Sequence, residues 1–388
     1  MEREARHTEL AERYLPGDRL DRFRSRAAVY DRENRFFDED LAELRECGYL
    51  KILAPEDRGG AGLTINQTAR LQQRLATAAP ATALGINMHL LCLAIARVMA
   101  DRGDASLAWT FDEAVAGEIF ALGVSEPGND WVLQGSTTRA ERQSDGGYLL
   151  SGAKVFTSLS PAWTRLLVHG LDDADPARPR LVYGFIERGV GVAVTGEWNV
   201  SGMRATHSRT TILERARLAP ARIVRKVPPG RKPDLLTLAI SMNFQLLIGS
   251  VYAGIARRAL TLAAEALRRR HSIKHAEQFA ELPEFRVRLA DAYRRFLPVA
   301  AELDLYTRDV DECVDHGKAW PLLLVGARVN ASRAARRAVE VAMMCAGGAS
   351  YARGGELERL QRDATASLFH PASVDAARPM YAAALLDD

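Results

Sequence analysis

Hydrophobic positions along the chain change their spacing twice. Up to about residue 118, apolar residues such as Leu41 and Leu44 recur at helical spacing and predict helices. Short β-rich runs separated by turns follow, as in 181–186, and a loop rich in proline and basic residues then leads into long helices rich in Ala, Leu and Arg. The pattern predicts an α+β fold. Its expected parts are an N-terminal helical domain (1–118), a middle β domain (119–228) and a C-terminal helical bundle (229–388).

Two stretches without charge, 75–96 and 235–256, are about as long as a membrane span. Each carries polar residues that are costly to place against lipid, among them Asn87, His89 and Asn243. We therefore expect two buried helices inside a large helical protein, and no membrane partner.

Composition and charge narrow the class of protein. The hydrophobic content of 47% predicts a folded chain, and the formal net charge of +3, with basic and acidic residues interspersed, predicts no nucleic-acid partner. The four cysteines lie far apart, so neither a disulfide framework nor a metal site is expected. The charged N-terminal residues do not resemble a signal peptide, and we expect a cytoplasmic protein.

Several motifs resemble those of the acyl-CoA dehydrogenase superfamily, in that family's order. The matching segments are 44–63, 123–128, 148–158, 198–208, 347–351 and 357–364. The resemblance implies an N-terminal helical domain, a middle β-barrel or sandwich domain and a C-terminal four-helix bundle. It also implies a bound flavin, and a homotetramer or homodimer in which the neighbouring subunit completes the flavin site.

The resemblance also implies which residues contact the flavin. Hydrogen-bond donors near the ring's N1, C2 carbonyl and N5 set its reactivity, because charge changes there on reduction. The amides near Val124 and the hydroxyl of Ser125 would face the pyrimidine edge, with Thr157 and Ser158 near N5. Alternatively, both serines are strand-end hydroxyls that satisfy local backbone. The implied cofactor-binding residues are Val124, Ser125, Thr157, Ser158, Gly347 and Gly348.

The chain departs from the family at the catalytic base. Dehydrogenases of this family take a proton from carbon with a glutamate nine residues after the arginine that matches Arg362, and that position holds Pro371. The family's other placement for the glutamate falls on Phe244, and the arginine beside it becomes Gln245. We expect Phe244, Gln245 and Trp131 to line a substrate pocket.

A histidine stands near the missing base. The two-component flavin monooxygenases of the superfamily place a histidine eight residues after the matching arginine, and His370 lies eight residues after Arg362. Near C4a and N5 of the flavin, a histidine can donate a hydrogen bond to a hydroperoxide or deprotonate a substrate. Its alternative role is to cap a helix end. His89 resembles a pocket histidine of the same branch, although a core histidine is its other interpretation. The candidate catalytic residues are His370, Ser158 and His89.

These features predict a flavin-dependent oxidoreductase. The favoured reaction is that of a monooxygenase or oxidase, in which reduced flavin and O2 form a C4a-(hydro)peroxide that attacks a small-molecule substrate. The motifs expected to hold the ADP half of the cofactor are altered, which suits FMN, or FAD supplied reduced by a separate flavin reductase. The alternatives are an acyl-CoA or acyl-carrier-protein dehydrogenase with a base from another position, and a scaffold subunit without catalysis.

Overall fold

The computed structural model describes residues 2–230 and 234–387, and its first third is helical. Local sequence explains where the helix at 65–76 begins: Thr64 and Gln67 form a reciprocal capping box that satisfies backbone N–H groups at its start. The helices of this part are α1 (Glu2–Tyr14), α2 (Gly17–Glu33), α3 (Asp38–Glu46), α4 (Ile65–Ala76), α5 (Pro80–Asp101) and α6 (Trp109–Val115).

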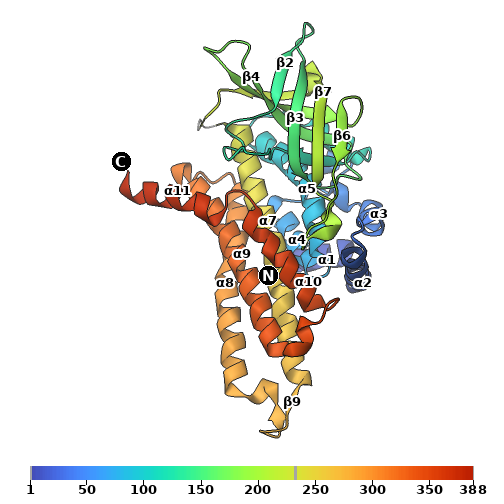
Figure 1. The fold of residues 1–388 in the computed structure, drawn as a ribbon, viewed down its shortest axis with the longest axis vertical. Coiled ribbons are helices and arrows are strands. Elements are labelled where there is room, and N and C mark those ends of the chain that lie inside the picture. Colours follow the sequence, from blue (N-terminus) through green and yellow to red (C-terminus); the bar gives the residue numbers. More distant parts are fainter. Residues whose placement is uncertain (1, 231–233, 388) are drawn as a thin grey trace.

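The strands that follow α6 form one eight-stranded sheet within the described residues. Neighbouring strands follow the order β6-β7-β3-β2-β4-β5-β8, and β1 pairs in parallel with β4. The bounds are β1 (Phe120–Gly123), β2 (Arg139–Arg142), β3 (Tyr148–Thr157), β4 (Arg165–Asp172), β5 (Arg180–Glu187), β6 (Val192–Thr195), β7 (Arg209–Leu218) and β8 (Ile223–Val227). The sheet lies at one end of the molecule (Figure 1).

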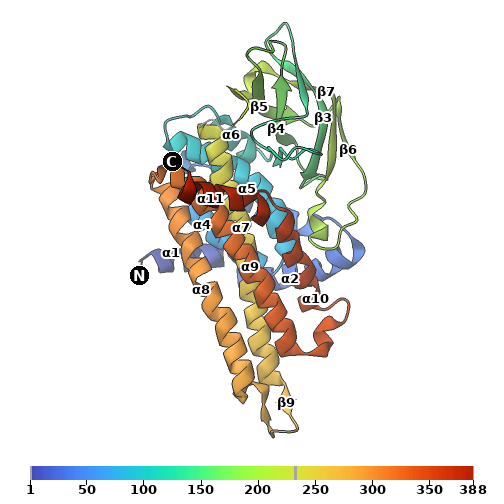
Figure 2. The ribbon, with the colours of Figure 1, turned by 60° about the vertical axis from the view of Figure 1, so that its left-hand side comes forward.

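Long helices make up the C-terminal part. Asp234 caps the first of them by accepting hydrogen bonds from the N–H groups of Leu236 and Thr237. The elements are α7 (Leu235–Arg269), the hairpin β9 (His271–Ser272) and β10 (Glu277–Gln278), α8 (Pro283–Asp311), α9 (Trp320–Ala346), α10 (Glu356–Thr365) and α11 (Val374–Leu386). Helices α7, α8, α9 and α10 pack side by side and extend away from the sheet (Figures 1 and 2).

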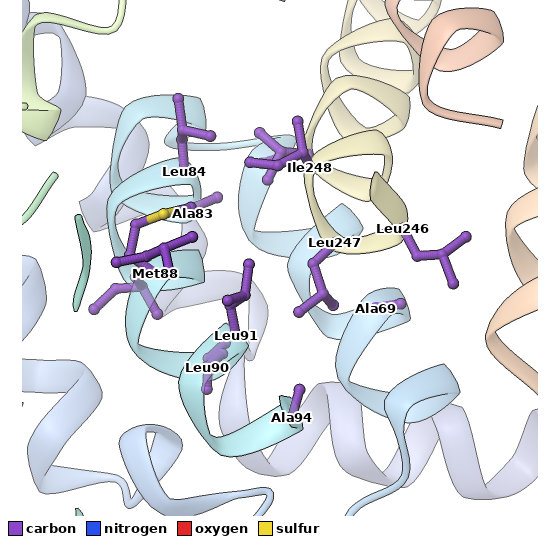
Figure 3. Close-up of a cluster of buried hydrophobic side chains, with 14 of the residues drawn as sticks. Ala69, Ala83, Leu84, Met88, Leu90, Leu91, Ala94, Leu246, Leu247 and Ile248 are labelled. Atoms are coloured by element: carbon purple, nitrogen blue, oxygen red, sulfur yellow. The ribbon is translucent and has the colours of Figure 1, made fainter. Parts of the chain in front are cut away.

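The two helices that contain the charge-free stretches join these parts in one core. In Figure 3, Leu91 of α5, Ala69 of α4 and Leu247 of α7 lie in one cluster of buried side chains. By length and composition α5 and α7 could each cross a membrane, but 89% and 72% of their most apolar stretches are buried inside the chain. Both are thus core helices, as the polar residues within them predicted. The order of helices, sheet and helices confirms the predicted α+β class.

Candidate functional site

The end of strand β3 is irregular. Its pairing with β7 shifts between Lys154 and Thr157, and Phe156 has a φ of +56°, a left-handed conformation that is strained for an aromatic residue. As a result the side chain of Phe156 is 60% exposed and meets the ring of Trp198 edge-on, while Thr157 and Ser158 are buried. An exposed aromatic face beside buried hydroxyls is a surface on which a planar ring can stack.

Three hydroxyl groups form a chain behind this surface. Ser158 Oγ lies 2.7 Å from Ser208 Oγ, which lies 2.8 Å from Thr206 Oγ1, and Thr206 donates to the carbonyl of Met203 at 2.8 Å. A carbonyl oxygen can only accept, so the single hydrogen of Thr206 is committed to Met203. Ser208 must then donate to Thr206, and Ser158 to Ser208. Ser158 Oγ therefore offers only lone pairs to a ligand.

The loop after β1 lies against the same end of β3. Val155 donates its N–H to the carbonyl of Ser125 at 2.9 Å. The following residue, Glu126, forms a fully buried ion pair with Lys154 at 2.5 Å. The structure thus brings Ser125 close to the end of β3, together with Val124, Thr157 and Ser158 as neighbours of these bonded residues. Their roles toward a flavin remain predictions.

The loop between β6 and β7 connects this surface to the C-terminal helices. Met203 donates its N–H to the buried carboxylate of Asp363 at 2.5 Å, and Arg362 donates to the carbonyl of Ser201 at 2.7 Å. Burial raises the pKa of Asp363 to about 6, against the opposing effect of the Met203 hydrogen bond. The loop that supplies Thr206 and Ser208 is therefore held by α10, the last α-helix before His370.

His370 follows α10 and the short 3-10 helix η8 (Ala366–Phe369). Its ring lies against Phe244 and Tyr252 of α7, and its Nε2 is 2.6 Å from the hydroxyl oxygen of Tyr252. Burial, and secondly the positive charge of Arg328, lowers the pKa of His370 to about 3. The imidazole is therefore neutral at neutral pH.

Two side chains bind the backbone carbonyls that follow His370. Gln245 donates to the carbonyl of Pro371 at 3.1 Å, and Arg328 Nε donates to Gln245 Oε1 at 2.7 Å. Arg328 also donates to the carbonyl of Ala372. Among the described residues, no carboxylate takes part in these bonds or lies within salt-bridge distance of Arg328. Of the two positions that correspond to a dehydrogenase base, Phe244 thus lies against a neutral histidine and Pro371 follows that histidine in the chain.

His89 is differently placed. Its Nε2 lies 2.6 Å from the carbonyl of Leu50, and its Nδ1 accepts the N–H of Phe120 at 3.1 Å. Burial lowers its pKa to about 4, so it stays neutral and joins α5 to the start of the sheet. Because both ring nitrogens are bonded to backbone, this histidine has none left for a substrate, and it fits the interpretation as a core histidine.

Three further residues predicted for the site are not brought to the end of β3 or to His370 within one chain. Trp131 lies in the loop after β1 and is 58% exposed. Gly347 and Gly348 follow α9, and Gly347 lies beside Arg270, which comes directly after α7. Helix α7 has 35 residues and is about 50 Å long, so these glycines lie far from the sheet. Their predicted role requires the neighbouring subunit that the family resemblance implies.

Tyr252 and Arg328 were not predicted from the sequence. A signal for Tyr252 existed, because positions seven and eight residues after Gln245 and Phe244 lie on the same face of a helix. Arg328 is the one charge in an apolar run of α9, between Trp320 and Ser332. Such a buried, isolated arginine indicates a specific partner, but the sequence does not say which.

Comparison with known proteins agrees with this architecture. Residues 20–102 match the N-terminal domain of acyl-CoA dehydrogenase, and residues 246–375 match its C-terminal domain. L-Evernosamine nitrososynthase of Micromonospora sp. is 27% identical over 369 residues, 90% of this chain and 83% of that protein. YdbM of Bacillus subtilis, provisionally named an acyl-CoA dehydrogenase, is 26% identical over 373 residues, 92% of this chain and 91% of that protein.

Solved structures show the same fold. KijD3, in complex with FMN and dTDP-3-amino-2,3,6-trideoxy-4-keto-3-methyl-D-glucose, has a TM-score of 0.83 at 24% identity, over 95% of this chain and 91% of that one. TdsC of Paenibacillus sp. A11-2, a dibenzothiophene monooxygenase solved with FMN and indole, has a TM-score of 0.80 at 22% identity, over 95% of each chain.

The fold and the matched domains define a flavoprotein scaffold of the acyl-CoA dehydrogenase type. The chain belongs to the acyl-CoA dehydrogenase superfamily, whose members include flavin monooxygenases and nitrososynthases, as the sequence motifs predicted. Its residues fit a flavin ring, because the exposed face of Phe156 lies beside Ser158 and the buried Thr157 hydroxyl, which has no partner among the described residues.

Proposed function

We propose that this protein is a monooxygenase that uses reduced flavin and O2 to oxidise a small organic substrate. The observation that carries the proposal is the set of side chains around His370. Where dehydrogenases of the family need a carboxylate, this chain has Phe244 and Pro371, and the titratable side chain beside Phe244 is a neutral imidazole. A group that stays unprotonated down to about pH 3 is a weak base for a proton on carbon.

The hydroxyl chain at β3 supports the same function. Ser158 can only accept a further hydrogen bond, because its hydrogen is committed through Ser208 and Thr206 to a carbonyl. Reduced flavin carries a hydrogen on N5, whereas oxidised flavin presents a lone pair there. If Ser158 faces N5, as the family resemblance implies, the site favours the reduced cofactor.

The cofactor and partners follow from the proposed reaction. When bound, the reduced flavin supplies the electrons that activate O2. Phe156 would support the ring, and Ser158 and Ser125 would bind its polar edge. FMN is the cofactor named with both KijD3 and TdsC, and we propose FMN or FAD delivered in reduced form by a separate reductase. We also propose a homodimer or homotetramer, because Gly347 and Gly348 need a neighbouring subunit to reach a flavin site.

Rapid mixing of the protein and reduced FMN with oxygenated buffer tests the proposal. We expect a transient absorbance spectrum distinct from those of reduced and oxidised flavin, and a shorter lifetime of this transient in His370→Ala. Immediate reoxidation with stoichiometric peroxide release would contradict the proposal. Anaerobic bleaching of the flavin-loaded protein by an acyl-CoA would instead identify a dehydrogenase with a base at another position.

A further inference from the structure

Tyr252 is the polar neighbour of His370 on helix α7. Its side chain is fully buried, and its hydroxyl oxygen lies 2.6 Å from His370 Nε2. Other ionisable groups surround the pair: Arg328 from α9 acts on both rings, and Asp363 from α10 acts on Tyr252. None of them forms a hydrogen bond with either ring among the described residues. The phenol and the imidazole are therefore each other's partner.

The direction of this hydrogen bond follows from counting hydrogens. A phenol has one hydrogen, and a neutral imidazole has one hydrogen on either nitrogen. If Nε2 donated to the Tyr252 oxygen, the phenol hydrogen would be buried without an acceptor among the described residues, at the full desolvation cost of an unmade hydrogen bond. If the phenol donates to Nε2, both groups are satisfied. The imidazole hydrogen then lies on Nδ1.

We infer that Tyr252 is a positioning residue that holds His370 as the neutral tautomer with its hydrogen on Nδ1. Nδ1 has no hydrogen-bond partner among residues 2–230 and 234–387, so its N–H is available to a ligand. His370 therefore acts as a hydrogen-bond donor and not as a base. The catalytic role of His370 as a donor rests on the proposed function. The tautomer itself is a property of the protein without cofactor.

The tautomer can be measured by long-range ¹⁵N–¹H spectroscopy of protein labelled in histidine, with the His370 signals assigned by their loss in His370→Gln. In the wild type at pH 7 we expect one ring nitrogen of His370 to be protonated, and we expect it to be Nδ1. In Tyr252→Phe we expect the Nε2-protonated form to become populated. The reason is that this variant lacks the phenol hydrogen that occupies the Nε2 lone pair in the wild type. Tyr306→Phe, which removes a phenol whose ring faces His316, is the matched control and should leave His370 unchanged.

Two results would overturn the inference: a wild-type His370 protonated on Nε2 or on both nitrogens at pH 7, or a tautomer that is the same in Tyr252→Phe. Because the spectra are recorded without flavin, they are independent of oxygen chemistry. A confirmed tautomer together with immediate flavin reoxidation would leave the role of Tyr252 intact and reject the monooxygenase proposal. The other tautomer together with a transient flavin spectrum would reject the role of Tyr252 and leave the monooxygenase proposal intact.

Discussion

Single hydrogen atoms decide what the two ends of this site can bind. At β3, the hydrogen of Ser158 is directed inward to Ser208 and Thr206, so its oxygen is an acceptor. At the end of α10, the inferred hydrogen on Nδ1 makes His370 a donor. Neither property belongs to the residue type, because serine and histidine can each do both. Each is set by a neighbouring hydroxyl group.

This view predicts the effect of Thr206→Val. Without the Thr206 hydroxyl, Ser208 loses its acceptor, and both serine hydroxyls are free to turn outward. We expect the preference for reduced over oxidised FMN to fall roughly fivefold, which corresponds to about 1 kcal/mol, the net value of one hydrogen bond. Anaerobic fluorescence titrations with both flavin forms measure it.

The control for this experiment is Thr211→Val. Thr211 of β7 is also fully buried, but its hydroxyl has no hydrogen-bond partner among the residues that the structure describes. The change in shape is therefore the same without a change in hydroxyl direction. An unaltered preference in Thr206→Val would show that Ser158 is not fixed as an acceptor.

At the scale of elements, the C-terminal helices act together on the segment after His370. Helix α7 contributes Gln245, and α9 contributes Arg328, which is 1% exposed and donates to Gln245 and to the carbonyl of Ala372. A buried guanidinium without a carboxylate partner is costly. Among the residues that the structure describes, its charge is balanced by carbonyl dipoles alone. It therefore also acts on the nearby imidazole and opposes its protonation.

Arg328→Met should therefore raise the pKa of His370. The rise should be partial, since burial is the larger cause of the low value and remains in the variant. A pH titration of the His370 ring signals measures the change. Arg333→Met, at an exposed position of the same helix, is the control and should leave the pKa unchanged. If the two variants titrate alike, Arg328 does not act on His370.

The elements themselves were largely predictable, and the contacts between them were not. Apolar runs predicted the buried helices α5 and α7, since a long helical stretch without charge must lie inside. The motif order predicted the arrangement of helices, sheet and helices. By contrast, the bond of Tyr252 to His370 joins positions 118 residues apart, and that of Arg328 to Gln245 joins positions 83 apart. Such pairs depend on helix packing, which periodicity does not determine.

Across the whole molecule, each of the three parts contains a histidine whose pKa is strongly lowered. These are His89 in the N-terminal helices, His169 in β4 and His370 after α10, and burial is the main cause that lowers their pKa values to about 4, 3 and 3. Each ring is unprotonated in the folded protein but gains a proton near pH 6.5 when the chain unfolds. As the pH falls below 6.5, the unfolded state therefore binds more protons, and these histidines make folding less favourable.

His169→Gln isolates one of these contributions. His169 Nε2 lies 2.9 Å from the carbonyl of Gly135, and Nδ1 lies 3.4 Å from the ammonium of Lys154, which is the second cause of its low pKa. Removing this ring should reduce the loss of unfolding free energy between pH 6 and pH 4.5 by about 1.4 kcal/mol per pH unit, the value for one proton. The raised pKa values of Asp40 and Asp363, about 7 and about 6, act in the opposite sense. They are common to both proteins and cancel in the comparison.

Urea unfolding across this pH range provides the measurement, with His271→Gln, at an exposed position, as control. Equal pH dependence in wild type and His169→Gln would mean that the β4 histidine is not held neutral by the fold.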